Sequence, residues 1–166
     1  MMTSASELKK LMLRKPRLTL AAAESLTCGH LQAAIGAEPG ASNYFLGGVT
    51  AYSLEQKVRL LGVNRVHARR VNCVSQRVAV EMAQGACALF GAGIAVATTG
   101  YAEPSKEKGI KAPLAWWALC HVRRGDRAEI ISGLIEMPGA TRVAAQEEVA
   151  REVLNQLTAY LRSWRG

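Results

Sequence analysis

Segment 22–29 contains the side chain with the clearest chemical potential in the chain, in the sequence Ala-Ala-Glu-Ser-Leu-Thr-Cys-Gly. The apolar run at 18–23 predicts a buried strand, and a helix is predicted over about 27–37. Ser25 is therefore expected at the carboxyl end of a strand, beside unpaired N–H groups that can bind an anion or a developing oxyanion. A serine there can act as a nucleophile. The simpler alternative is that Ser25 or Thr27 only caps the helix.

Lys57 is the second residue with a chemical role to explain. Ser53 and Gln56 form an S-x-x-Q capping box, which predicts a helix over 53–61. Lys57 falls on the same helical face as the apolar residues of this segment, which are Leu54, Val58 and Leu61. Desolvation and the positive end of the helix dipole are both expected to lower its pKa, and a neutral lysine can act as general base for a serine. The alternative is that its stem snorkels to the surface.

The remaining pattern alternates strands and helices and ends in a hairpin. Strands are predicted at 44–52, 93–100, 114–123 and 127–136, and helices from Ser75 to Gly91 and over 141–163. This order predicts a single domain, 1–166, with a three-layer α/β/α sandwich and a mixed, mostly parallel sheet. Sites in such sheets lie at the carboxyl ends of the strands. We therefore expect Ser25, Tyr52, Thr98 and Thr99 to converge there, near a long and functional loop at 101–113.

Composition limits the classes of function. With 49% apolar and 20% charged residues, the 166-residue chain resembles an ordinary soluble protein. No apolar stretch reaches the roughly 20 residues of a membrane span, and the N-terminus lacks the apolar region of a secretory signal, so we expect a cytoplasmic protein without a membrane partner. The net charge of +8 suits a phosphate-bearing metabolite or loose attraction to nucleic acid. Because the basic residues are scattered and no recognition motif is present, no specific nucleic-acid partner is expected.

The cysteines and histidines show no ligand spacing. Cys28, Cys73, Cys87 and Cys120 are far apart in the sequence, and no C-x-x-C motif occurs. We therefore expect reduced thiols, no metal site and no cofactor.

Several segments together resemble the C-terminal domain of the CinA competence/damage-inducible proteins. They are Glu-Ser-Leu-Thr-Cys-Gly at 24–29, Pro-Gly-Ala-Ser at 39–42, Tyr-Phe-Leu-Gly-Gly-Val at 44–49, Ala-Tyr-Ser at 51–53, Lys-Val at 57–58, Leu-Gly-Val at 61–63, Val-Ser at 74–75 and Thr-Gly at 99–100. The resemblance covers nearly the whole chain and is densest over 21–63. It indicates the stand-alone form, without the molybdopterin-binding-like domain that precedes it in longer members.

The resemblance implies an amidohydrolase that converts nicotinamide mononucleotide and water to nicotinate mononucleotide and ammonia, in pyridine nucleotide salvage. By motif, Ser25 resembles the family nucleophile and Lys57 its base, with Tyr52 assisting. The residues expected around the substrate amide and oxyanion are Thr27, Gly29, Thr99 and Gly100. A small-molecule nucleotide is the expected partner, and a homo-oligomer is the expected assembly.

The chain departs from the family pattern at three places. Cys28 replaces a glycine, which makes a positive φ costly and places a side chain where backbone would approach the substrate. A glycine-rich loop is replaced over 99–105, where Glu103 adds negative charge near a phosphate. The family arginine that opens the last helix is missing, and Arg142 is expected to substitute for it. These changes support the alternative of a catalytically silent relative that binds a nucleotide or a partner. A nucleic-acid-associated protein is a third hypothesis, supported only by the net charge.

Overall fold

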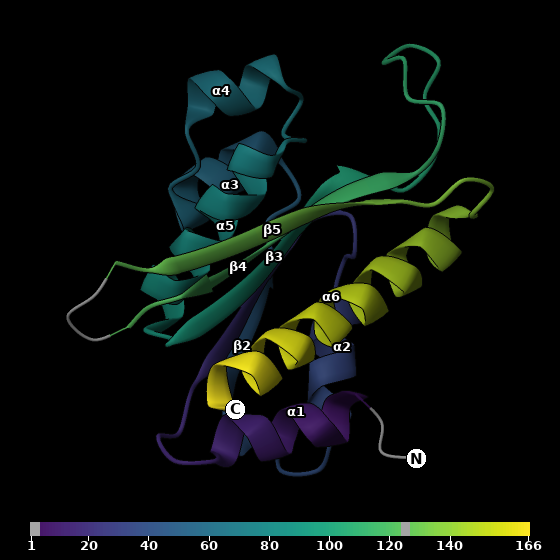
Figure 1. The fold of residues 1–166 in the computed structure, drawn as a ribbon. Helices are drawn as coiled ribbons and strands as arrows, with labels where there is room; N and C mark the ends of the chain where they lie inside the picture. Colours follow the sequence, from purple (N-terminus) through teal and green to yellow (C-terminus); the bar gives the residue numbers. More distant parts are fainter. Residues whose placement is uncertain (1–3, 124–126) are drawn as a thin grey trace.

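A five-stranded sheet with the order β2-β1-β3-β4-β5 forms the centre of the molecule, shown in Figure 1. The computed structural model describes residues 4–123 and 127–166. The strands are β1 (Leu20–Glu24), β2 (Phe45–Thr50), β3 (Ile94–Tyr101), β4 (Leu114–His121) and β5 (Glu129–Glu136). The helices are α1 (Ser4–Leu13), α2 (His30–Gly36), α3 (Leu54–Leu61), α4 (Arg65–Arg70), α5 (Gln76–Phe90) and α6 (Arg142–Arg165), with a 3-10 turn η1 (Ala41–Asn43).

The sheet is mixed and mostly parallel, as predicted. Strands β2, β1 and β3 pair in parallel, whereas β4 is antiparallel to both of its neighbours, so only β4 runs against the other four. Helices α1, α2 and α6 cover one face, and α3, α4 and α5 cover the other (Figure 1). This arrangement confirms the three-layer α/β/α prediction. The predicted turn between β4 and β5 includes residues 124–126, which lie outside the described residues.

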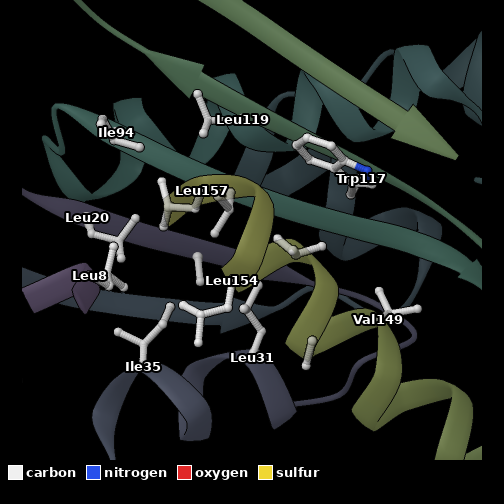
Figure 2. Packing of buried hydrophobic residues seen from close by; sticks show 14 of the residues in the cluster. Leu8, Leu20, Leu31, Ile35, Ile94, Trp117, Leu119, Val149, Leu154 and Leu157 are labelled. Carbon is white, nitrogen blue, oxygen red and sulfur yellow. The ribbon is translucent and has the colours of Figure 1, made fainter. Parts of the chain in front are cut away.

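The core lies on both faces of the sheet and holds the strand ends in place. Figure 2 shows the cluster between the sheet and α1, α2 and α6, in which Leu20, Leu31 and Leu157 are fully buried. On the other face Gly85 of α5 approaches α3 so closely that an added Cβ would lie 2.1 Å from the carbonyl oxygen of Leu61. Because nothing larger than glycine fits there, α3 is held tightly against α5.

Helix α2 begins later than predicted. Its first residue is His30, and Gly29 is its N-cap with φ of 98°, so neither Ser25 nor Thr27 caps it. The prediction of a helix from Thr27 is wrong because the buried carboxylate of Glu24 draws the chain into a turn. Glu24 accepts hydrogen bonds from the N–H groups of Gly29, Leu31 and Gln32 at 2.8–3.1 Å.

Two other segments also differ from their predictions. The short helix α4 was not predicted; Asn64 caps it by accepting the N–H of His67 at 2.9 Å. The predicted loop begins one residue later, after Tyr101, and backbone hydrogen bonds between Ser105 and Ile110 close a small turn within it. Among the helices of the described residues, none combines the length and the hydropathy of a membrane-spanning segment.

Candidate active site

A cavity of about 450 Å³ lies beside the carboxyl ends of β1 and β3. Six of the predicted site residues line it: Ser25, Tyr52, Lys57, Thr99, Gly100 and Arg142. They come from five parts of the chain, which the parallel strands and the first turns of α3 and α6 bring together. The cavity is therefore built where the strand pattern predicted convergence.

Ser25 and Lys57 are in direct contact inside this cavity. Lys57 Nζ lies 2.8 Å from Ser25 Oγ, 2.8 Å from the carbonyl oxygen of Ala51 and 2.9 Å from that of Tyr52. The Lys57 side chain is only 1% exposed. The alternative in which its stem snorkels to the surface is therefore wrong.

The surroundings of Lys57 favour a neutral amine at mildly alkaline pH. Desolvation by burial lowers the pKa of Lys57 from 10.5 to about 8, which confirms the predicted direction. A neutral amine has two N–H groups and one lone pair. If the N–H groups donate to the carbonyls of Ala51 and Tyr52, the lone pair is left facing the Ser25 hydroxyl. This donor and acceptor set suits proton abstraction from Ser25.

Helix α3 sets the direction of the lysine side chain. Ser53 caps the helix by accepting the N–H of Gln56 at 3.3 Å, as the capping box predicted, and Gly62 ends it in the left-handed region. Lys57 therefore sits in the first turn with its stem directed inward. The contact of Gly85 with Leu61 holds the other end of α3 against α5.

Glu24 is the residue that sequence reasoning missed in the Ser25 turn. Its carboxylate is fully buried and takes up three N–H groups at the start of α2, so the anion site predicted at this helix N-terminus is already occupied by the protein itself. The turn is closed by hydrogen bonds from Cys28 N–H to Ser25 and from His30 N–H to Thr27. A glutamate at the end of an otherwise apolar strand was the signal that could have shown it.

Thr27, Gly29 and Cys28 lie outside the cavity. The Thr27 hydroxyl is buried against the Thr98 hydroxyl, at 2.8 Å, and Gly29 is committed to the α2 cap, so the structure does not bring either to the substrate position. Cys28 has φ of 46°, so it adopts the positive φ that the replacement of glycine makes costly. Its side chain is exposed and does not line the cavity, so the expectation that it stands in the substrate path is wrong.

The connection between α4 and α5 forms a wall of the cavity that the sequence did not predict. Asn72, Cys73 and Val74 line it, and Asn72 and Cys73 both adopt positive φ, 50° and 62°. Thr99 Oγ1 donates to the carbonyl oxygen of Cys73 at 2.7 Å, and Asn72 donates to the Tyr101 hydroxyl at 2.9 Å. Two successive left-handed residues store backbone strain, a feature that clusters at functional sites.

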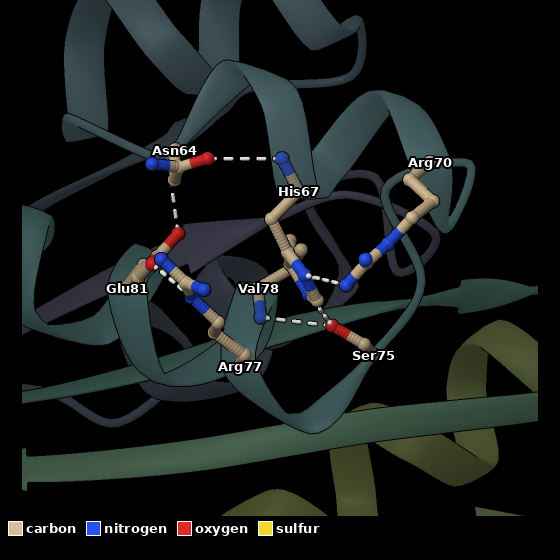
Figure 3. A network of polar contacts seen from close by, with 7 residues as sticks. All are labelled: Asn64, His67, Arg70, Ser75, Arg77, Val78 and Glu81. Carbon is tan, nitrogen blue, oxygen red and sulfur yellow. Dashed lines mark hydrogen bonds and ion pairs between the residues drawn. The ribbon is translucent and has the colours of Figure 1, made fainter.

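A polar network, drawn in Figure 3, fixes this connection. His67 and the N-cap Ser75 are joined by a hydrogen bond of 2.9 Å, and Ser75 accepts the N–H of Val78. Asn64 donates its N–H to Glu81 of α5. These bonds join α4 to the first turns of α5, while the hydrogen bond from Thr99 to Cys73 joins the strained segment to β3.

An ion pair closes the rim of the cavity. Glu103 Oε1 and Oε2 accept from the Arg142 guanidinium at 2.7 and 3.2 Å. The Arg142 guanidinium lowers the pKa of the Glu103 carboxyl, so this carboxylate is ionised and paired rather than an uncompensated negative charge. The Tyr52 phenol lies beside Arg142 and is 57% exposed, while Lys108 lies 5.6 Å from the centre of the Tyr101 ring.

Metal-binding chemistry has no donor set within the described ranges. No group of three His, Cys, Asp or Glu side chains there is arranged to hold a metal ion. Burial also raises the pKa of the Cys73 thiol, so this cavity-lining sulfur is neutral. The cavity therefore contains a serine hydroxyl in hydrogen-bond contact with a desolvated lysine amine.

Fold and site together define an α/β protein with a buried serine–lysine pair at the end of a mostly parallel sheet. The chain belongs to the CinA C-terminal domain family, whose model matches residues 2–161. A CinA-like protein of Chlorobium limicola is 37% identical over 163 residues, which are 96% of this chain and 37% of that protein. The chain thus spans well under half the length of this curated relative.

Solved structures of the same superfamily share the fold. A CinA superfamily protein from Klebsiella pneumoniae 700603 superposes with a TM-score of 0.86 and 28% identity, covering 97% of each chain. A competence or damage-inducible protein from Enterobacter asburiae gives a TM-score of 0.81 and 30% identity, covering 97% of this chain and 99% of that one.

Proposed function

We propose that the protein is a metal-independent serine amidohydrolase that hydrolyses nicotinamide mononucleotide to nicotinate mononucleotide and ammonia. The observation that carries this proposal is the 2.8 Å contact between Ser25 Oγ and the desolvated amine of Lys57. A base that is neutral near pH 8 and touches a serine hydroxyl supplies a nucleophile without a Lewis acid.

In the first step, neutral Lys57 takes the Ser25 proton as Oγ attacks the amide carbon. The negative charge then forms on the amide oxygen. The N–H group of Leu26, which follows Ser25 directly and lines the cavity, has no acceptor among the described residues, so it is available to this oxygen. Lys57 returns the proton to the leaving nitrogen, and ammonia departs from an acyl-enzyme ester on Ser25.

In the second step, water replaces ammonia. Lys57 takes a proton from the water as its oxygen attacks the ester carbon, and the proton passes to Ser25 Oγ when the ester bond breaks. The product is a carboxylic acid that releases its proton to water and leaves as the carboxylate, with its nucleotide unchanged. Tyr52 contributes its carbonyl to the Lys57 site and its phenol to the rim, next to the positions available to the substrate.

The cavity also suits a mononucleotide. A volume of about 450 Å³ lies in the range of small-molecule sites, and Lys108 and Arg142 on the lining can attract a phosphate. One observation favours the alternative of a nucleotide-binding relative without activity. The Arg142 guanidinium already forms an ion pair with Glu103.

The test is ammonia release from nicotinamide mononucleotide by the purified protein, with nicotinate mononucleotide quantified by chromatography. We expect turnover that Ser25→Ala abolishes and that Ser163→Ala, on the exposed last turn of α6, leaves unchanged. Turnover in Ser25→Ala equal to that of the wild type would show that Ser25 is not the nucleophile. Calorimetric binding of the mononucleotide without any ammonia would support the inactive relative instead.

A further inference from the structure

A second cavity, of about 570 Å³, lies at the opposite end of the sheet from Ser25. Its position is set by His121, the last residue of β4, which pairs with Ile94 at the start of β3. The walls are mainly apolar, and the rim carries two guanidinium groups. The lining residues are Pro16, Arg17, Leu18, His121, Val122, Arg123 and Trp164.

His121 is held in one orientation by a relay of hydrogen bonds. The Tyr160 hydroxyl donates to Glu129 Oε2 at 2.9 Å, so its oxygen can only accept from His121 Nδ1, at 2.7 Å. Glu129 faces His121 across the β4–β5 pair and also binds Arg123. The Trp164 ring packs edge-on against the imidazole with centroids 4.9 Å apart. The proton of the neutral imidazole is therefore on Nδ1.

The second ring nitrogen, Nε2, is consequently a hydrogen-bond acceptor. The His121 side chain is 2% exposed, and no described residue hydrogen-bonds to Nε2. Burial, together with the charges of Arg123 and Arg165, lowers the pKa of His121, so the ring is neutral at pH 7. An open acceptor on the wall of a mainly apolar cavity favours a ligand that brings a hydrogen-bond donor to it.

We propose that this second cavity binds a small aromatic carboxylic acid that carries a hydroxyl or N–H donor. The donor binds His121 Nε2, the ring contacts Leu18, Val122 and Trp164, and the carboxylate binds the exposed guanidinium of Arg17 at the rim. Arg123 is already paired with Glu129, so it keeps the relay in place and adds to the positive potential. This site is separate from the Ser25 cavity and does not depend on the proposed amidase activity.

The experiment is calorimetric titration of the whole protein with 4-hydroxybenzoate. Benzoate, which lacks the hydroxyl donor, and phenol, which lacks the carboxylate, are titrated for comparison. We expect a dissociation constant below about 1 mM for 4-hydroxybenzoate and binding about tenfold weaker for each of the other two. Ser25→Ala should leave the affinity unchanged. A loss of binding in that variant would place the ligand in the Ser25 cavity and overturn the proposal.

Two variants test the contacts. Arg17→Gln, at an exposed position, should weaken the binding of 4-hydroxybenzoate about fivefold to tenfold and leave the binding of phenol unaffected. Arg151→Gln, which changes an exposed arginine of α6, is the matched control and should have no effect on either ligand. His121→Phe keeps an aromatic ring and should weaken 4-hydroxybenzoate and phenol to the same extent, with little effect on benzoate. Equal binding of the three molecules, or no binding at millimolar concentrations, would refute the site.

Discussion

At the residue scale, the environment of Lys57 Nζ decides which chemistry the cavity can perform. Three oxygens lie within 2.9 Å of one nitrogen, and only one of them, Ser25 Oγ, carries a proton that can be transferred. If Lys57 lost its contacts with the two carbonyl oxygens, its N–H groups would have no hydrogen-bond acceptors. The backbone therefore orients the lysine, and its burial sets the pH at which it becomes a base.

The first prediction is that hydrolysis depends on pH through Lys57. Because the neutral amine is the base and its pKa is about 8, kcat/KM should rise about tenfold per pH unit below pH 8 and level off above it. The measurement is the initial rate of ammonia release from pH 6 to 10. A plateau that extends unchanged down to pH 6 would mean that Lys57 is not the base.

The second prediction separates the activity of Lys57 from its effect on stability. Lys57→Met fills the same space and should reduce kcat by about 10²- to 10⁴-fold. The folded-state pKa is lower than the unfolded one, so protonation favours the unfolded chain, and wild-type stability should increase as the pH rises from about 8 to 10.5. Below pH 8 the variant should therefore be as stable as the wild type or more so. Urea denaturation of both proteins at pH 7 and pH 10 measures these stability differences. A Lys57→Met variant much less stable than the wild type at pH 7 would contradict the prediction.

The third prediction concerns the rim ion pair. Glu103→Gln releases the Arg142 guanidinium, so kcat/KM for nicotinamide mononucleotide should increase several-fold, whereas the value for nicotinamide, which lacks the phosphate, should not change. Glu107→Gln, an exposed glutamate in the same loop, is the matched control. The same increase for both substrates would show that Arg142 does not bind the phosphate.

At the element scale, local sequence signals predicted α3 and β1 but not the turn between β1 and α2. The capping box at Ser53 is a local pattern, and its hydrogen bond forms within four residues. Glu24 instead reaches N–H groups up to eight residues away, so its effect on the start of α2 could not be read from neighbouring residues. The strained wall at Asn72 was missed for the same reason, since its side-chain partner, Tyr101, lies on β3, 29 residues away.

The fourth prediction tests Glu24 as the anchor of the Ser25 turn. Glu24→Gln replaces a charged acceptor of three N–H groups by a neutral amide, which should lower the free energy of unfolding by about 1–3 kcal/mol and reduce kcat through displacement of Ser25. Urea denaturation and ammonia release measure the two effects. Glu38→Gln, outside this turn, is the control, and equal small effects in both variants would argue against the anchor.

At the scale of the whole molecule, the alternation of apolar segments was sufficient to predict the layers and the edge at which Ser25, Tyr52 and Thr99 meet. It could not predict the second cavity, because His121, Arg17 and Trp164 lie in three parts of the chain that are distant in the sequence. The two cavities lie at opposite ends of the same strands. The sheet thus separates one buried base, Lys57, from another, His121.

The last prediction follows from the burial of His121. Its folded-state pKa lies below the ordinary value of 6.5, so as the pH falls below about 6.5 the unfolded chain takes up a proton that the folded chain does not, and stability is lost. His121→Phe removes this titration, so the decrease in the urea midpoint between pH 7 and pH 5 should be smaller in the variant than in the wild type. His30→Phe is a control at a less buried histidine. If the decrease is the same in the wild type and His121→Phe, then His121 takes up a proton as readily in the folded protein as in the unfolded chain, and burial does not lower its pKa.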